Sequence, residues 1–442
     1  MAKELFPTGI LVPGNGAAAV EATQGLINIS QTDTLFEAAF SSQKLTARAD
    51  ILKRTQGGWH VLEVKSSFAD TSSIRQLVDD LAYTVFVARR TGLNVTKASL
   101  VLLSRAYRFG NGSDLLFEIL DKTVEVDARV AEFIKVADSL PTALFADTRP
   151  AASLLPACRE CNFFETDCLG LGVLHSVLEI PGLHHTKLKR LSAASIIDMA
   201  QTPTDLGLNE RQERARLSSI AGTTFVSPAL SAALRVFQFP CYYLDFETVA
   251  TVLPMYDNHS CHRQVLTQFS VHRKEAIGSD PTHIDYLADA TQDCEKLVAD
   301  ALIDALGNLG SIVVYSSFEK TRISGLRDAY PDLATALQAI LDRLADLLPV
   351  LQEHVYHPAF RGSFSIKKVL PALVPTLSYA GLEVRDGDTA IARFARMANG
   401  TISGEDVALT RKQLLDYCKL DTLAMVRLHE TLHALGSANN TP

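Results

Sequence analysis

The sequence predicts an α/β protein with mixed sheets, built from two sheet-containing modules and a helical connector. Short apolar segments of strand length alternate with longer segments of helical periodicity in both halves of the chain. The chain has 442 residues, more than one hydrophobic core usually serves. The stretch at residues 184–236 contains helical pieces without strand alternation. We therefore expect domains at residues 1–183 and 237–442, joined by this connector.

The first module is expected to begin with strands at residues 34–40 and 45–52, where apolar and polar residues mix on either side of a polar turn. A glycine pair marks the next turn, and residues 59–64 have the β-favouring, apolar composition of a strand covered on both faces. Residues 74–90 carry apolar positions along one helical face. Residues 98–103 predict a further buried strand.

The second module is expected to begin with a strand at residues 242–247, followed by strands at 268–272 and 311–315. Long helices alternate with these strands. The last helix, at residues 409–435, repeats apolar residues together with Tyr417 and Asp421 on neighbouring positions of one face.

Composition limits the classes of function. No apolar run is long enough to cross a bilayer, and the first five residues do not resemble a signal peptide, so we expect a cytoplasmic protein without a membrane partner. Seven cysteines, an odd number, argue against a disulfide framework. The net charge of -8 argues against a protein that coats nucleic acid nonspecifically. It leaves room for a nuclease, because bound divalent cations reverse the local sign of the field.

A group of acids in the second module predicts a metal centre. Asp245 and Glu247 lie two apart on one strand and share a face, Glu319 follows a strand end, and Asp421 lies one helical turn after Tyr417. Clustered carboxylates are tolerated when a divalent cation offsets their repulsion, and oxygen ligands suit Mg²⁺ or Mn²⁺. The alternatives are a solvated strand face, an acid favoured by the helix dipole, and a core tyrosine.

The order of these motifs resembles the DEDD exonucleases, which have an RNase H-like fold. The resemblance implies that Asp245, Glu247 and Asp421 bind metal and that Tyr417 orients the attacking water. The family usually has Asp where this chain has Glu319, whose side chain is one methylene longer.

Between the second and third motifs, Ser365, Lys367 and Lys368 are candidates for binding substrate phosphates. A solvated helix start would show the same residues. The segments around positions 243–248, 365–373 and 417–422 also resemble a bacterial family of unknown function, in which a RecB-like nuclease module precedes an RNase H-like exonuclease. This similarity covers nearly the whole chain.

In the first module, Asp50 and the pair Glu63 and Lys65 form the pattern Asp, twelve residues, Glu-x-Lys. Such a trio can hold one divalent ion while the ammonium stabilises charge on the phosphoryl group. The pattern resembles the RecB-like branch of the PD-(D/E)XK nucleases, which have a restriction-endonuclease-type core. In those relatives a Gln commonly stands where this chain has Thr84. The alternatives are an exposed strand edge and a platform that only binds DNA.

Cys158, Cys161 and Cys168 lie within eleven residues, a spacing typical of zinc or iron-sulfur ligands. The RecB-like resemblance implies a 4Fe-4S cluster, whose fourth ligand in relatives is an earlier cysteine, and no cysteine precedes Cys158 in this sequence. Three alternatives remain: a sequence that starts late, zinc with a further ligand such as His175, or a vestigial site. The other four cysteines are expected to be buried or incidental thiols.

Together these patterns predict a metal-dependent nuclease that hydrolyses DNA phosphodiesters, with 3′-to-5′ exonuclease activity at the second module and a second nuclease site at the first. The alternatives are a catalytically silent scaffold that binds nucleic acid in a defence or repair complex, and an exoribonuclease acting on RNA. The sequence indicates no particular protein partner.

Overall fold

The structure, a computed structural model, describes residues 2–29, 31–112, 115–137 and 139–438. The chain forms two compact units, residues 1–150 with 250–263 and residues 151–249 with 264–442. Both contain sheets and helices, which confirms the α/β class. The domains expected from the sequence, at residues 1–183, 184–236 and 237–442, have other boundaries than these two units. The difference arises because the segment that carries the three clustered cysteines (residues 151–183, called the cysteine segment below) shares a core with the connector. This core includes Leu154, Phe164, Leu178 and Leu206.

The first unit has a six-stranded sheet in the order β1-β2-β3-β4-β5-β6. Its strands are β1 (Ile10–Leu11), β2 (Thr34–Ser42), β3 (Leu45–Thr55), β4 (Gly58–Phe68), β5 (Val95–Leu103) and β6 (Phe117–Asp121). Its helices are η1 (Ala2–Leu5), α1 (Gly16–Ile27), α2 (Ile74–Arg90), α3 (Thr123–Val136) and α4 (Ser139–Leu144). The strands and the helix expected here are confirmed, and each of the four strands is longer than predicted.

Both faces of this sheet are covered, as the apolar strands predicted. Leu52, Val61 and Leu100 join α1, α2 and α3 in one core. Ile51 and Leu62, which alternate with them along β3 and β4, pack on the opposite face. Successive side chains of a strand leave opposite faces, so an apolar run is stable only where both faces are buried.

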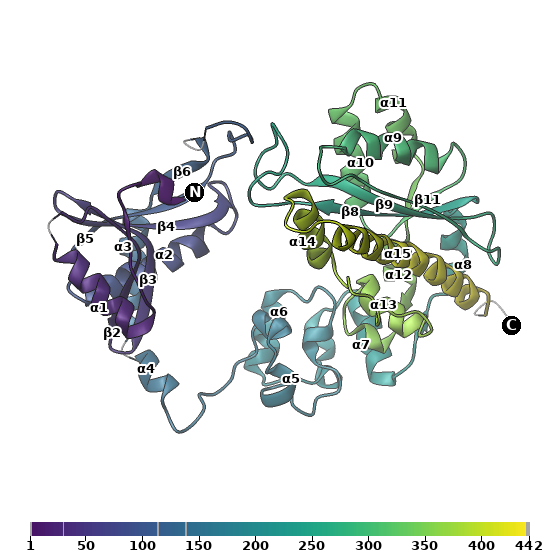
Figure 1. Ribbon diagram of the computed structural model, residues 1–442. Helices are drawn as coiled ribbons and strands as arrows, with labels where there is room; N and C mark the ends of the chain where they lie inside the picture. Colours follow the sequence, from purple (N-terminus) through teal and green to yellow (C-terminus); the bar gives the residue numbers. More distant parts are fainter. Residues whose placement is uncertain (1, 30, 113–114, 138, 439–442) are drawn as a thin grey trace. The chain divides into compact units, whose positions relative to one another are not determined.

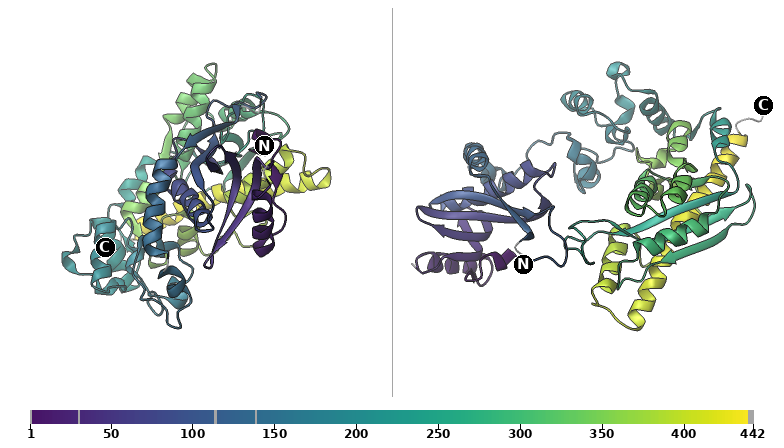
Figure 2. Two further views of the ribbon diagram at one scale, coloured as in Figure 1. Left: turned by 90° about the vertical axis from the view of Figure 1, so that its left-hand side faces the viewer. Right: turned by 90° about the horizontal axis from the view of Figure 1, so that it is seen from above.

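The second unit has a five-stranded sheet in the order β10-β9-β8-β11-β12. The strands are β8 (Cys241–Val249), β9 (Val265–Lys274), β10 (Thr282–Leu287), β11 (Ile312–Val314) and β12 (Leu344–Asp346). β8 pairs with β9 in antiparallel orientation and with β11 in parallel orientation, so the first strand of the unit is central. Helix α15 (Glu405–Ala438) lies along one face, and α9 (Glu295–Leu306) and α10 (Phe318–Ala329) lie on the other (Figure 1 and Figure 2).

Further elements complete this unit. They are η3 (Pro156–Glu160), α5 (Phe164–Asp167), η4 (Val177–Glu179), α6 (His185–Ala193), η5 (Met199–Gln201), η6 (Thr204–Leu206), α7 (Glu210–Ala221), β7 (Phe225–Val226), α8 (Leu230–Ala233), η7 (Leu234–Val236), α11 (Ala334–Leu341), α12 (Leu347–His354), β13 (Val355–Tyr356), η8 (Pro358–Phe360), α13 (Ile366–Leu373) and α14 (Gly387–Ala398). The connector is helical as expected except for β7, which pairs with β13. A two-residue strand is too short to show alternation in the sequence.

Buried polar contacts fix helix α15 against the sheet. The Thr422 hydroxyl hydrogen-bonds with Ser270 Oγ at 2.8 Å and His272 Nδ1 at 2.7 Å, both on β9. Further along, Tyr243 Oη and His429 Nδ1 lie 2.8 Å apart. These contacts set which face of the helix meets β8. Among the helices that the structure describes, none is both long and apolar enough to span a membrane.

Candidate metal centre

The acids of the second unit meet where the parallel strands end. Asp245 and Glu247 lie in the second half of β8, and the parallel register pairs Tyr243 with Val313 of β11. The chain leaves β11 at Val314 and enters α10 at Phe318, which brings Glu319 to the same edge. Carboxyl ends of parallel strands are where open α/β sheets commonly bind ligands.

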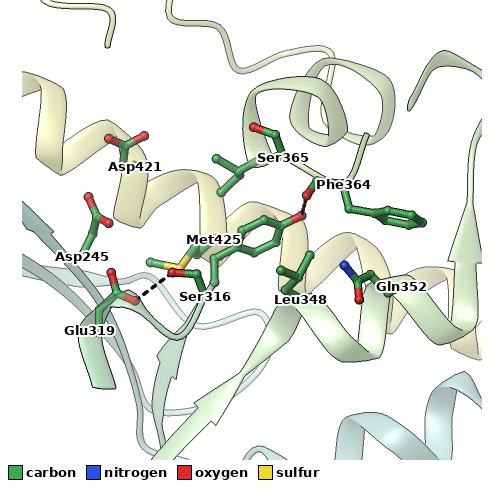
Figure 3. A pocket seen from close by; sticks show the side chains of 11 residues that line it. Asp245, Ser316, Glu319, Leu348, Gln352, Phe364, Ser365, Asp421 and Met425 are labelled. Carbon is green, nitrogen blue, oxygen red and sulfur yellow. Dashed lines mark hydrogen bonds between the residues drawn. The ribbon is translucent and has the colours of Figure 1, made fainter. Parts of the chain in front are cut away.

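Asp245, Glu247 and Asp421 form the centre of the site. One carboxylate oxygen of each lies within 4.8 Å of the others, and among the described residues no other set of three or more acids, histidines and cysteines meets this criterion. Asp421 reaches the group from α15 across the face of the sheet. Figure 3 shows Asp421 on the same side of the pocket as Asp245 and Glu319.

Burial and mutual repulsion raise the pKa values of these acids. The pKa of Asp245 lies well above its ordinary value because the group is buried and because Asp421, Glu319 and Glu247 are close. Burial, followed by the charge of Asp421, raises the pKa of Glu247 to about 8. Burial raises the pKa of Asp421 to about 6, against the opposing effects of Tyr379 and Lys367. A divalent cation among the three would relieve this repulsion.

Glu319 stands beside this group of three. Its Oε2 accepts a hydrogen bond of 3.4 Å from Ser316 Oγ, and burial raises the pKa of its carboxyl to about 7. It lines the same pocket as Asp245 and Asp421. Its longer side chain therefore reaches the site, although it does not belong to the closest set of oxygens.

Two tyrosines flank Asp421. Tyr417, expected from the helical spacing, is buried on α15. Tyr379, which the sequence analysis did not select, donates a hydrogen bond of 2.6 Å from its hydroxyl to Asp421 Oδ1. The two rings lie 6.4 Å apart between centroids. Tyr379 comes from the loop between α13 and α14, and no local pattern in the sequence marks it as a site residue.

The three candidate phosphate-binding residues separate around the start of α13. Ser365 lines the acidic pocket. Lys367 lies near the acids, where its charge lowers the pKa of Glu247 and Asp421, and its Nζ donates to the Arg385 carbonyl at 3.0 Å. Lys368 lines a different pocket, toward the cysteine segment.

The acidic pocket has a volume of about 500 Å³ and two chemically different ends. Figure 3 shows Asp245, Glu319 and Asp421 at one end, with Leu348, Gln352 and Phe364 at the other. Tyr315 Oη donates to the Phe364 carbonyl at 2.8 Å and so holds the wall of the apolar end. A ligand that meets the acids through a bound cation and places an apolar part at the other end fits such a pocket.

The trio predicted in the first unit also comes together. Asp50 Oδ2 accepts a hydrogen bond of 2.7 Å from the Val64 amide, and Lys65 Nζ lies 3.1 Å from Glu63 Oε1. Burial, followed by the charge of Asp50, raises the pKa of Glu63 to about 7. The sequence did not predict that Lys65 also pairs with Asp80 on α2.

The three clustered cysteines occupy the turns around η3 and α5. Cys161 is exposed, whereas Cys158 and Cys168 are partly buried. In the described part of the chain their sulfur atoms do not form a group within 4.8 Å. His175 hydrogen-bonds with Glu179 at 2.8 Å. Zinc or an iron-sulfur cluster here stays a prediction. The other four cysteines are buried as expected, and Cys418 Sγ lies 3.6 Å from Asp245 Oδ2.

Comparison with known proteins gives relatives without an assigned activity. Residues 242–365 match the model of a family described as a domain of unknown function, DUF2779. The chain is 30% identical over 210 residues to an uncharacterized protein (MG366 homolog) of Mycoplasma pneumoniae, and 24% identical over 209 residues to the uncharacterized protein MG366 of Mycoplasma genitalium. Each match covers 42% of this chain and 31% of the relative. No solved structure matches significantly.

Proposed function

We propose that the protein is a metal-dependent nuclease that hydrolyses DNA phosphodiesters at the Asp245, Glu247 and Asp421 centre, with 3′-to-5′ exonuclease polarity. The observation that carries the proposal is the convergence of three acids from a strand and a distant helix within 4.8 Å. Folding brings together charges that repel each other, an arrangement typical of sites that bind divalent cations.

The donor set fits Mg²⁺ or Mn²⁺, because all of its atoms are carboxylate oxygens. Asp245, Glu247 and Asp421 would hold the cation, with Glu319 beside them. The bound cation would supply activation of water and neutralisation of charge at the phosphate. Strand order supports an RNase H-like fold for this unit, since the central β8 pairs with β9 in antiparallel orientation on one side and with β11 in parallel orientation on the other.

The surrounding residues have separate roles in this proposal. Tyr379 holds Oδ1 of Asp421 and so fixes the orientation of this carboxylate. Tyr417 lies one turn before Asp421 and is the candidate for orienting water. Lys367 adds positive charge where phosphate would enter. The apolar end formed by Leu348 and Phe364 suits a base or sugar.

The test is degradation of end-labelled single-stranded and double-stranded DNA and RNA with Mg²⁺ or Mn²⁺. We expect the double variant Asp245→Asn, Glu247→Gln to lose activity by about 100-fold or more, which is about 2.7 kcal/mol in the barrier. Asp416→Asn is the control, because this acid lies on α15, the helix that carries Asp421, and pairs with Lys412 at the surface. Full activity in the double variant would overturn the proposal. Degradation of RNA alone would favour the exoribonuclease.

We also propose a second metal site at Asp50, Glu63 and Lys65, in a RecB-like module. Glu63 Oε2 is buried and has no hydrogen-bond partner in the described structure, which suits an oxygen that takes a cation. The ion pair between Lys65 and Asp80 opposes a catalytic role for Lys65 and favours a module that only binds nucleic acid. Lys65→Ala distinguishes the two, because loss of part of the nuclease activity indicates a working second site.

A further inference from the structure

A second pocket lies beside the acidic pocket in the same compact unit. It has a volume of about 660 Å³, and its walls come from the cysteine segment and from the chain around residues 360–368. Ser363 and Lys368 line this pocket, whereas Ser365 and Ile366 line the acidic one. The two pockets are therefore separated only by the first turn of α13 and the residues before it.

Contacts between the two walls fix the shape of this pocket. Arg361 Nη2 lies 2.7 Å from Glu165 Oε1 and 3.0 Å from Glu179 Oε1. Gly362 has a φ of +80°, and a Cβ atom there would come within 2.1 Å of the Glu179 carbonyl oxygen. Only glycine allows this approach. The loop before α13 is thus held on the cysteine segment.

The charges that face the pocket are not balanced. Both of its acids are engaged, Glu165 by Arg361 and Glu179 by Arg361 and His175. Arg159 uses Nε for the Leu178 carbonyl, and its terminal nitrogens stay available. Neither Arg159 nor Lys368 forms an ion pair with any residue in the described ranges. Arg159 and Lys368 therefore remain for an anion, and the three cations and two acids of the lining leave one net positive charge.

We infer that this second pocket binds a backbone phosphate of a single-stranded nucleic acid whose end occupies the acidic pocket. The inference rests on the proposed nuclease function for the identity of the ligand. Arg159 and Lys368 contact the phosphate, and the strand passes over the start of α13 between the two pockets. The cysteine segment thereby becomes one wall of the substrate-binding surface. Phosphate contacts of this kind position a strand without reading its sequence.

Binding of a fluorescein-labelled twelve-residue thymidine oligonucleotide to the full chain tests the inference. The measurement is fluorescence anisotropy in EDTA, so that hydrolysis does not occur. We expect Lys368→Glu and Arg159→Glu each to weaken binding about tenfold and to reduce the slope of log affinity against log salt by about 0.7. Lys189→Glu, an exposed lysine of α6 outside the pocket lining, is the matched control and should bind as the wild type does.

The outcomes separate this inference from the proposed function. Wild-type affinity and salt slope in both pocket variants would overturn the inference, as would an equal loss in Lys189→Glu, which would indicate general electrostatics only. If the pocket variants lose binding while the wild type shows no hydrolysis with Mn²⁺, the pocket stands and the nuclease proposal fails. Circular dichroism melting of each variant confirms that it folds.

Discussion

The strongest quantitative expectation concerns the pH dependence of Mn²⁺ affinity at the acidic centre. Metal binds ionised carboxylates, and the pKa of Glu247 is raised to about 8. Its ionised fraction falls from about one half at pH 8 to about 1% at pH 6, a roughly 50-fold change that corresponds to about 2.3 kcal/mol. Affinity is therefore highest above pH 8 and is lost as the pH falls. At pH 7, binding should release about one proton from Glu247.

Isothermal titration calorimetry with Mn²⁺ between pH 6 and 8.5 measures the affinity. Repeating the titration in buffers of different ionisation enthalpy measures the number of protons released on binding. The first unit would complicate the result, because the pKa of Glu63 is raised to about 7. The titration is therefore carried out on Glu63→Gln, which removes that carboxyl. In the added variant Glu247→Gln we expect weaker binding with a shallower pH dependence. An affinity that changes less than about threefold between pH 8 and pH 6 would refute the reasoning.

Three further predictions concern single side chains. Tyr379→Phe removes the hydroxyl that donates to Asp421 and should lower both kcat, by about tenfold, and Mn²⁺ affinity; unchanged values of both would contradict its role. Glu63→Gln should raise the thermal unfolding midpoint in EDTA at pH 8. In the folded protein the pKa of Glu63 is raised to about 7, so ionising this carboxyl as the pH rises lowers the free energy of unfolding, by about 3 kcal/mol once the pH is above 7. The glutamine does not ionise and removes this loss. The gain should vanish at pH 4, and a pH-independent gain would argue against this cause. Thr422→Val leaves Ser270 without one partner and should lower the free energy of urea unfolding by about 1–3 kcal/mol; a loss below about 0.5 kcal/mol would count against the network.

Local periodicity was sufficient to predict much of the fold. The apolar run at residues 59–64 and the helical face at residues 74–90 correspond to β4 and α2, because both patterns depend on which faces of one element are covered. The same reasoning placed Asp245 beside Glu247 and Tyr417 beside Asp421. The short β7 was missed because its partner, β13, lies more than a hundred residues later.

The separation of Lys367 from Lys368 illustrates what local patterns omit. Both were grouped as phosphate-binding candidates, yet one lies near the acids and the other lines the second pocket. Adjacent residues of a helix point in directions about 100° apart, and what each direction meets is decided by packing. The contact between Lys65 and Asp80 has the same origin, since it joins a strand to the helix that covers it.

The sequence by itself determined that Asp245 and Glu247 share a strand face and that a tyrosine and an acid share a helix face. Only the tertiary structure decided that these faces meet, that Glu319 stands beside the group, and that Tyr379 holds Asp421. The physical reason is that spacing along the chain fixes direction within one element. Distance between elements depends on strand register and on buried contacts such as those of Thr422, which join residues about 150 positions apart.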